Sequence, residues 1–412
     1  MKIGIITYWQ SEDNYGQLLQ CWALQQYLSK IGHDPFAIRF MRHVPLAQDC
    51  QVKEKKKSLS QKASDCAIRI ARIILVVPYV MDKRRRQRIK LQQKKELELN
   101  AYISGRNQER GFDDFRKQNL KFSDITYPTI ESLRTNPPQA DIYITGSDQV
   151  WNYELHPTEL EAFFLQFGPS EAKRISYAPS IGHKSWPLHL KEQLRAYLSA
   201  FDAISVREKS AIPIVNSCGF DAQNVLDPTM LLRARDYDML LKEAANSNKE
   251  PKVENIYIYS INYKDRNDIP WEDIKSLANE HNLRFIVTPG SGYTPCRELF
   301  DNVEYRYYTI PEWIRAISEC RLLVTASFHG IIFAILFHKD FIYTPLSGRL
   351  AESNSRVVDL LESLDLGNRI LSDKTCISSI FCNKIDWEEI DDRLDEARES
   401  SISFLKRNIK KP

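Results

Sequence analysis

The sequence predicts an α/β fold with two domains, each built on a parallel β-sheet. The chain has 412 residues, more than one ordinary hydrophobic core supports. Short apolar segments of strand length alternate along it with segments of helix length. A polar linker at 246–253 (NSNKEPKV) separates two such alternating stretches. We therefore place an N-terminal domain at 1–230, a C-terminal domain at 250–375, and a last amphipathic helix at 383–412 that crosses back to the first domain.

The first three elements form a Rossmann-like strand–helix–strand unit. Residues 2–8 and 35–40 are apolar strands, and 17–32 has helical apolar spacing and ends in glycine. The loop before this helix lacks the GxGxxG fingerprint, so a nicotinamide cofactor is not supported. The residues at the helix N-terminus have free backbone N–H groups, which favour an anion, or they form an ordinary βα turn; they are Asn14, Tyr15, Gly16 and Gln17.

Basic charge is concentrated in a helical insertion at about 50–100. Residues 53–95 hold fifteen Lys and Arg and three acids, a balance of +12 in a chain of net charge +3. The apolar part, 66–81, is too short to span a bilayer. Two interpretations are equally open: a surface resting on anionic lipid, or a crossover helix with a solvated basic face. Nucleic acid is a third, but no binding motif or aromatic platform accompanies the charge.

Three strands of the first domain end in polar residues of the kinds found in binding and catalytic sites. They are expected at 141–145 (DIYIT), 174–182 (RISYAPSIG) and 201–210 (FDAISVREKS). An arginine fork matches carboxylate and phosphate groups, and glycine gives a loop backbone freedom. Structural alternatives are that Asp148 caps the next segment and that Arg207 forms an ion pair with Glu208 or a neighbour. The polar residues at these strand ends are Gly146, Ser147, Asp148, Gln149, Ser180 and Arg207.

A histidine follows a central strand of the second domain. Strands are expected at 255–262, 283–289, 305–309, 322–327 and 341–345, with helices between most of them. The strand at 322–327 leads through Ser327 to His329 and Gly330, where an apolar helix begins. Ligands bind at the carboxyl ends of strands in open α/β sheets, so His329 is placed for chemistry. The alternative is a hydrogen-bonded polar residue at a strand end.

Several classes of protein are disfavoured. The eight cysteines are scattered without a CxxC pair, which argues against a zinc site and a disulfide framework and fits a reducing cytoplasm. The N-terminus MKIGIITYW reads as a strand and not as a signal peptide. No apolar run approaches the roughly 20 residues that span a bilayer, and no metal-ligand cluster is found. We expect a cytoplasmic protein, with contact at the inner face of the membrane through the basic segment.

Four stretches together resemble the polysaccharide pyruvyltransferase family. Among them, GSDQVWN and SFHG are fairly specific in this order and at strand ends. Many members have an arginine directly before the aromatic-His-Gly unit, where this chain has Ser327. The resemblance extends from the first strand into the second domain. The stretches are NYGQLLQCWALQQYL, DIYITGSDQVWN, SVREKSAIPIV with the later VLDPTML, and VTASFHGIIFAI.

The resemblance implies two Rossmann-like domains that face a cleft, similar to the two-domain, GT-B-like glycosyltransferases. It implies transfer of a pyruvyl group from phosphoenolpyruvate to two hydroxyls of a sugar, which gives a ketal and phosphate. The product would be a surface polysaccharide such as a capsule or exopolysaccharide. A lipid-linked acceptor at the cytoplasmic membrane face would account for the basic segment at 53–95. The donor is a substrate, and no cofactor, metal or nucleic acid is implied.

For that reaction we assign His329 as the general acid, Arg207 to the phosphate or carboxylate of the donor, and Asp148 to the proton of the attacking hydroxyl. Two other functions are open. A nucleotide-sugar glycosyltransferase would need a ribose-binding acid, for which Glu352 is available. A non-catalytic protein would bind a glycan or lipid. The residues assigned to substrate binding are Asn14, Tyr15, Gly16, Gln17, Gly146, Ser147, Gln149, Ser180, Ser327 and, as a second arginine, Arg356.

Overall fold

A computed structural model describes most of the chain. The basic helical insertion predicted at 50–100, with the membrane contact assigned to 53–95, lies outside the described residues. Most of the polar linker predicted at 246–253 lies outside them too. The described residues are 1–41, 105, 108–156, 158–247, 254–290, 298–372 and 376–410.

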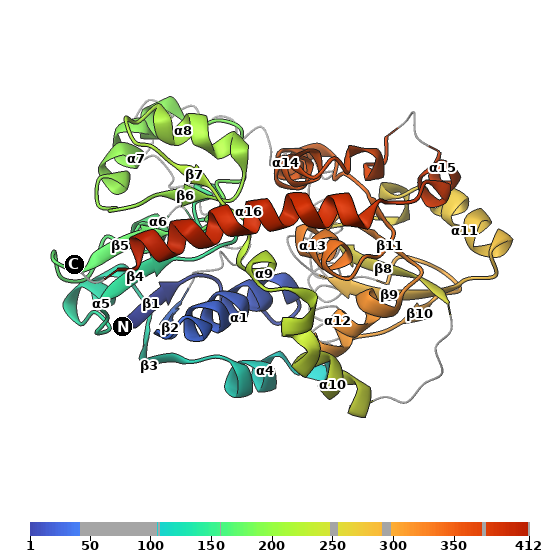
Figure 1. The fold of residues 1–412 in the computed structure, drawn as a ribbon, viewed down its shortest axis with the longest axis horizontal. Coiled ribbons are helices and arrows are strands. Elements are labelled where there is room, and N and C mark those ends of the chain that lie inside the picture. The colour runs from blue at the N-terminus through green and yellow to red at the C-terminus, as the bar shows by residue number, and fades with distance from the viewer. Residues whose placement is uncertain are drawn as a thin grey trace, which may run out of the picture. The chain divides into compact units, whose positions relative to one another are not determined.

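The first sheet has five parallel strands in the order β3-β2-β1-β4-β5 (Figure 1). This order is Rossmann-like, as predicted. Strand β3 was not predicted, because it lies at the sheet edge and three of its six residues are exposed, which removes the apolar pattern. The strands are β1 (Lys2–Ile6), β2 (Asp34–Phe40), β3 (Phe122–Tyr127), β4 (Ile142–Thr145) and β5 (Lys173–Ser176).

The strand predicted at 201–210 is shorter than expected and meets β5 only at an isolated bridge between Ile175 and Ala203. Only β6 (Ser205–Val206) forms, and it pairs in parallel with β7 (Gln223–Asn224) in a separate small sheet. Serine side chains explain the change. The Ser205 N–H donates to the Ser176 hydroxyl at 2.9 Å and the Ser205 hydroxyl donates to the Ser176 carbonyl at 2.7 Å, which replaces a regular ladder with β5.

Helices connect and cover the strands of this half. Helix α10 begins at Asp238, because Asp236 accepts the N–H of Arg233 and sets a 3₁₀ turn at Ala234–Tyr237 first. Further 3₁₀ turns lie at Leu188–Leu190 and Lys209–Ala211. The helices are α1 (Tyr15–Lys30), α4 (Phe112–Asn119), α5 (Ile130–Thr135), α6 (Leu160–Phe163), α7 (Lys191–Leu198), α8 (Ile212–Asn216), α9 (Pro228–Leu231) and α10 (Asp238–Ser247).

The second sheet repeats the topology of the first, with five parallel strands in the order β10-β9-β8-β11-β12. All seven residues of its central strand β8 are buried, as expected for a parallel strand covered on both faces. Four of the five predicted strands are present near their expected bounds, whereas the strand predicted at 305–309 is only two residues long and ends at Tyr305. The five strands are β8 (Asn255–Ile261), β9 (Arg284–Gly290), β10 (Glu304–Tyr305), β11 (Leu322–Thr325) and β12 (Phe341–Tyr343).

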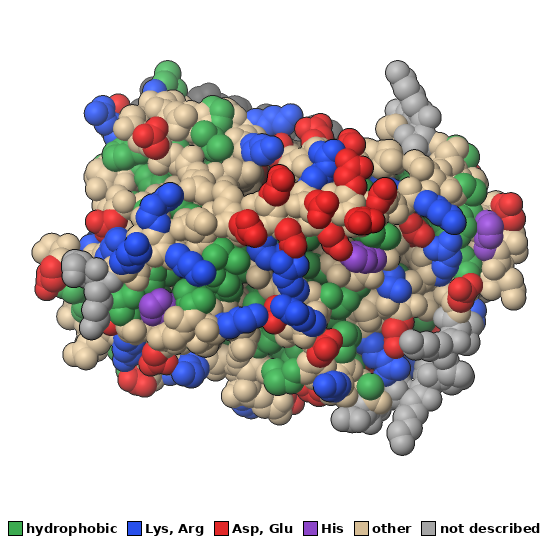
Figure 2. Space-filling view, in the orientation of Figure 1, with side chains coloured by type: hydrophobic (Ala, Val, Ile, Leu, Met, Phe, Trp, Pro, Cys, Tyr) green, Lys and Arg blue, Asp and Glu red, His purple; other side chains and the backbone are tan. Residues whose placement is uncertain are grey.

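Six helices described in this half include the long C-terminal α16. Figure 2 shows acidic side chains gathered over α14 and the first part of α16, whereas α16 ends in Lys406 and Arg407. This charge order complements the helix dipole. 3₁₀ turns lie at Arg266–Asp268, Gly348–Asn354 (η5) and Gly367–Arg369. The helices are α11 (Trp271–Glu280), α12 (Ile310–Glu319), α13 (Phe328–Leu336), α14 (Ser355–Ser363), α15 (Ile377–Cys382) and α16 (Trp387–Asn408).

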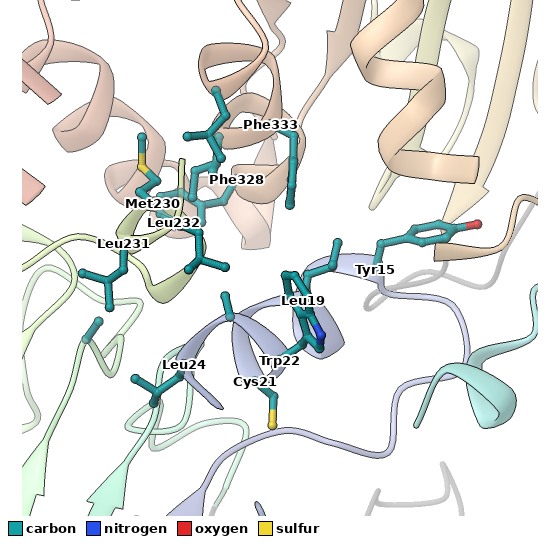
Figure 3. Close-up of a cluster of buried hydrophobic side chains, with 14 of the residues drawn as sticks. Tyr15, Leu19, Cys21, Trp22, Leu24, Met230, Leu231, Leu232, Phe328 and Phe333 are labelled. Carbon is teal, nitrogen blue, oxygen red and sulfur yellow. The ribbon is translucent and has the colours of Figure 1, made fainter. Parts of the chain in front are cut away.

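One buried apolar cluster contains side chains from both sheets and from α1, α9 and α13. Figure 3 shows where these three helices meet, with Trp22 and Leu19 of α1 near Leu232 and Phe333. The ring of Tyr15 stacks on Trp313 of the second half, with centroids 4.9 Å apart. In addition, α16 packs along α9, where Nε of Arg398 donates to the Met230 carbonyl at 2.8 Å. The two halves therefore share a core.

Candidate active site

The predicted polar residues lie at the carboxyl ends of the strands. Strand β4 ends at Thr145, directly before the Gly146 loop, and β11 ends at Thr325, two residues before Ser327. Side chains from the two halves contact each other here, since Asp227 of the first half lies 3.5 Å from His329 of α13. This edge is where open parallel sheets bind ligands.

Asp227, the N-cap residue of α9, is the centre of the cluster. Its Oδ2 accepts hydrogen bonds from the Ser147 hydroxyl at 2.7 Å and from Nη1 of Arg207 at 3.2 Å, and Nε2 of His329 lies 3.5 Å from the same oxygen. Its Oδ1 accepts from the N–H and the hydroxyl of Thr229 at 3.0 and 2.7 Å. One buried carboxylate therefore contacts a serine, an arginine and a histidine from three strand ends.

The Asp227 carboxylate is ionised at neutral pH. Burial by itself would raise the pKa of this carboxyl. The positive charges of His329 and Arg207, with the hydrogen bond from Thr229, outweigh burial and hold that pKa well below its usual range. A fixed negative charge therefore lies beside Nε2 of His329.

Arg207 is a buried cation with unused donors. Its side chain is 2% exposed, and the guanidinium carbon lies 4.3 Å from the centre of the Phe328 ring. Nη2 lies 4.0 Å from Oδ1 of Asp148, but within the described residues neither Nε nor Nη2 has a hydrogen-bond partner. Buried donors are normally paired, so this arginine is suited to an anionic ligand.

The first turn of α13 fixes the position of His329. Ser327 is the N-cap residue, and its hydroxyl accepts the N–H of Gly330 at 3.0 Å. Gly330 packs closely, because a Cβ there would lie 3.0 Å from Cγ2 of Thr325. The structure thus gives Ser327 a capping role, and its predicted contact with substrate remains a prediction.

Gly16 of α1 packs directly against the histidine. A Cβ at Gly16 would lie 2.0 Å from Nδ1 of His329, so only glycine leaves the ring in place. Asn14 and Gln17, beside it, are half-buried. Tyr15 is different, because it is buried in the core and its hydroxyl donates to the Tyr308 carbonyl at 2.6 Å. The helix N-terminus and the histidine are brought together, whereas Tyr15 packs away from them.

The loop after β4 is held in an uncommon backbone conformation. Asp148 has a φ of 74°, in the left-handed region. Its Oδ1 accepts the N–H of Gln149 at 2.8 Å, as expected for a carboxylate that caps the next segment, and its carbonyl accepts the N–H of Ser180 at 2.8 Å. Strained conformations often lie at functional sites. The role of Asp148 as a base remains a prediction.

Of the ion pairs expected for Arg207, the structure shows one with Asp227, at 3.2 Å, and not one with Glu208. Oε1 of Glu208 instead accepts the hydroxyl of Ser180 at 3.1 Å and the N–H groups of Ile181 and Gly182 at 2.8 and 3.1 Å. Glu208 is 1% exposed. Glu208 therefore fixes the loop after β5 to the end of β6, and Arg207 pairs with Asp227 instead.

The two predicted arginines line one cavity. Its volume is about 30 Å³, and its lining includes Arg207, Asp227, Phe328 and Arg356. Arg356 lies in the first turn of α14, where its Nε donates to the Ser353 carbonyl at 3.1 Å. The second half thus supplies a guanidinium from α14 near that of Arg207, which follows β6.

A second polar cluster lies on the same loops. Nδ1 of His183 is 2.7 Å from Oε2 of Glu352 in η5, and its Nε2 is 3.1 Å from Oδ1 of Asn152. Nδ2 of Asn152 donates to Oε1 of Gln149 at 3.1 Å. Gln149 is therefore connected to the second half through Asn152 and His183.

Sequence reasoning missed Asp227, Glu208 and His183 as site residues. A signal existed for Asp227, because it follows an apolar segment and precedes a proline at a helix start, an N-cap pattern at a strand end. No local signal marks Glu208 or His183, since their partners lie 26 or more residues away. Of the described residues, no group of three or more could hold a metal ion, and none of their helices is long and apolar enough to cross a membrane.

A two-sheet α/β protein with an arginine, a histidine and a carboxylate at the strand ends is the class that this geometry defines. The model of one family, polysaccharide pyruvyl transferase, matches residues 14–347, and the chain belongs to that family. No curated protein matches.

Solved structures similar to this chain include two UDP-N-acetylglucosamine 2-epimerases. The one from Rickettsia bellii is 9% identical with a TM-score of 0.48, covering 99% of each chain. The one from Methanocaldococcus jannaschii is 12% identical with a TM-score of 0.47, covering 99% of this chain and 100% of the other. An alpha-glucosyltransferase in complex with UDP is 9% identical with a TM-score of 0.38, covering 99% of this chain and 96% of the other.

Proposed function

We propose that this family member transfers the pyruvyl group of phosphoenolpyruvate to two hydroxyls of a sugar. The observation that carries the proposal is the buried Arg207 guanidinium, which has unused donors beside the His329–Asp227 pair. Phosphoenolpyruvate carries a carboxylate and a phosphate, and an arginine fork binds either group. Arg356, at the same cavity, is proposed as the second anion-binding group.

In this proposal His329 protonates the methylene carbon of the donor, which leaves positive charge at C2. A sugar hydroxyl attacks C2 and gives its proton to Asp148. The bond from C2 to the phosphate oxygen breaks, and phosphate leaves with the bonding electrons. The second hydroxyl then closes the ketal, and its proton goes to the released phosphate. The negative charge of Asp227 supports the protonated state of His329 before the first step.

The loops around the reacting groups are assigned to binding. Backbone N–H groups at the start of α1 and in the loop after Gly146 are proposed donors to the phosphate oxygens, with Ser147, Gln149 and Ser180 as polar contacts. The acceptor is proposed to be a lipid-linked saccharide at the inner membrane face, which the basic residues 53–95 would approach.

The test is phosphate release from phosphoenolpyruvate with and without a panel of lipid-linked galactosides, glucosides and mannosaminides. We expect acceptor-dependent release, and a mass gain of one pyruvyl ketal on one saccharide. Arg207→Lys should raise the KM for phosphoenolpyruvate at least tenfold, because a lysine keeps the charge and loses the fork. Arg195→Ala, an exposed arginine on α7, is the control. Turnover of a nucleotide sugar, with no release from phosphoenolpyruvate, would overturn the proposal.

A further inference from the structure

The pair His183–Glu352 joins the two halves of the protein beside the site. His183 follows β5 in the first half, and Glu352 lies in η5 of the second half. Nδ1 of the histidine is 2.7 Å from Oε2 of the glutamate. The histidine side chain is 10% exposed and the glutamate side chain 63% exposed. The contact is therefore a partly solvated link between two segments 169 residues apart in the chain.

The surrounding hydrogen bonds determine where the protons lie. Oδ1 of Asn152 accepts the N–H groups of Glu154 and Leu155 at 3.0 and 3.3 Å, and its Nδ2 donates to Gln149, so the amide orientation is fixed. Nε2 of His183 must then donate to that Oδ1. A neutral imidazole has only one N–H group, so the contact with the Glu352 carboxylate needs a second proton. The carboxylate of Glu352 accepts in this contact, which places the second proton on the ring.

The other groups around His183 are consistent with this assignment of protons to its ring. The ring of Tyr153 stacks on it with centroids 4.7 Å apart, and burial raises the pKa of that phenol, so Tyr153 is neutral. Glu208 is directed to the backbone of the adjacent Gly182. Glu154 and Lys184, next in the chain to Tyr153 and His183, are exposed and of opposite charge.

We propose that protonated His183 and Glu352 are positioning residues that hold the two halves together, so that His329 of the second half stays beside Asp227 of the first. The inference rests on the proposed function only for what His329 does. The bond exists while His183 carries both protons and is lost when the ring gives one of them up. Activity and stability should both lose this contribution at alkaline pH.

The test compares the wild type with Glu352→Gln between pH 5.5 and 9. A glutamine can accept from the protonated ring or donate to the neutral one, so it keeps the contact at every pH. We expect kcat/KM of the wild type to fall about fivefold more than that of the variant on the alkaline side, a coupling at the low end of those between protein sites. The wild-type melting temperature should also fall more steeply with pH than that of the variant.

A matched control is Asp391→Asn, which alters the other exposed histidine–carboxylate pair, His338–Asp391 at 3.0 Å, and should leave both comparisons unchanged. Parallel melting curves for wild type and Glu352→Gln would overturn the link itself. A difference in melting with identical pH profiles of kcat/KM would overturn the positioning role. If no variant turns over phosphoenolpyruvate but the melting curves differ as expected, the link stands and the proposed function fails.

Discussion

At the scale of single residues, His329 and Asp227 depend on each other. The carboxylate holds the ring from one side, at 3.5 Å from Nε2, and Gly16 lies against Nδ1 on the other. A histidine fixed on both sides has a single orientation, which a proton donor requires. The ionised carboxylate adds the charge that a protonated ring needs.

His329→Ala should lower turnover by about 10²- to 10⁴-fold, the usual contribution of a general acid, while the fold is kept. Phosphate release measures the loss, and far-ultraviolet circular dichroism checks the fold. His338→Ala, at the other end of α13, is the control because its ring is 44% exposed and contacts Asp391 and Trp387 instead. Near-normal activity of His329→Ala would show that another group supplies the proton.

Asp227 also links stability to pH. Its pKa is depressed in the folded protein, so its stabilising charge is present above the unfolded pKa of about 3.9 and is lost as pH falls through the folded value. Asp227→Asn should therefore cost about 3 kcal/mol at neutral pH, because Arg207 and His329 lose a buried partner. The difference from the wild type should shrink below pH 4, as followed by urea unfolding. Asp221→Asn, an exposed aspartate, should show no such change. A constant difference across pH would contradict this account.

At the scale of elements, the first turn of α1 leaves room for the His329 ring because residue 16 has no side chain. Alanine normally stabilises a helix interior over glycine by about 1 kcal/mol. At Gly16 the added methyl would overlap Nδ1 of His329, so the ring must move.

We expect Gly16→Ala to lower kcat by at least tenfold through displacement of His329, with little loss of melting temperature. Gly367→Ala is the control, because a Cβ there meets nothing within 4 Å. Unchanged kcat in Gly16→Ala would mean that the ring position in the structure is not the one used in catalysis.

Elements with strong apolar patterns were predictable, and those shaped by polar contacts were not. The central strands β1, β8 and β11 are almost wholly buried, so their apolar segments predict them directly. Half of the residues of the edge strand β3 are exposed, and β6 is cut short by hydroxyl groups of Ser176 and Ser205. Such side-chain hydrogen bonds depend on partners that only the fold brings close.

At the scale of the whole molecule, the site could be predicted only as separate strand ends. Sequence position indicated Arg207, Ser147 and His329 because each follows an apolar segment. It did not indicate that all three contact one carboxylate, since Asp227 is 80 residues from Ser147 along the chain. The common topology of the two sheets explains the meeting, because both direct their carboxyl ends to the same region.

The shared core makes a last prediction about folding. The described residues of both sheets belong to one compact unit, and Trp313 of the second half is fully buried against Tyr15 of the first. Trp313→Ala should cost about 3–5 kcal/mol, as for other buried tryptophans. Because the core spans both halves, near-ultraviolet circular dichroism and tryptophan fluorescence should report one common transition, shifted as a whole in the variant. Leu188→Ala is the control, since that side chain is 85% exposed. Two separate transitions, with only one moved by the substitution, would show that the halves fold independently.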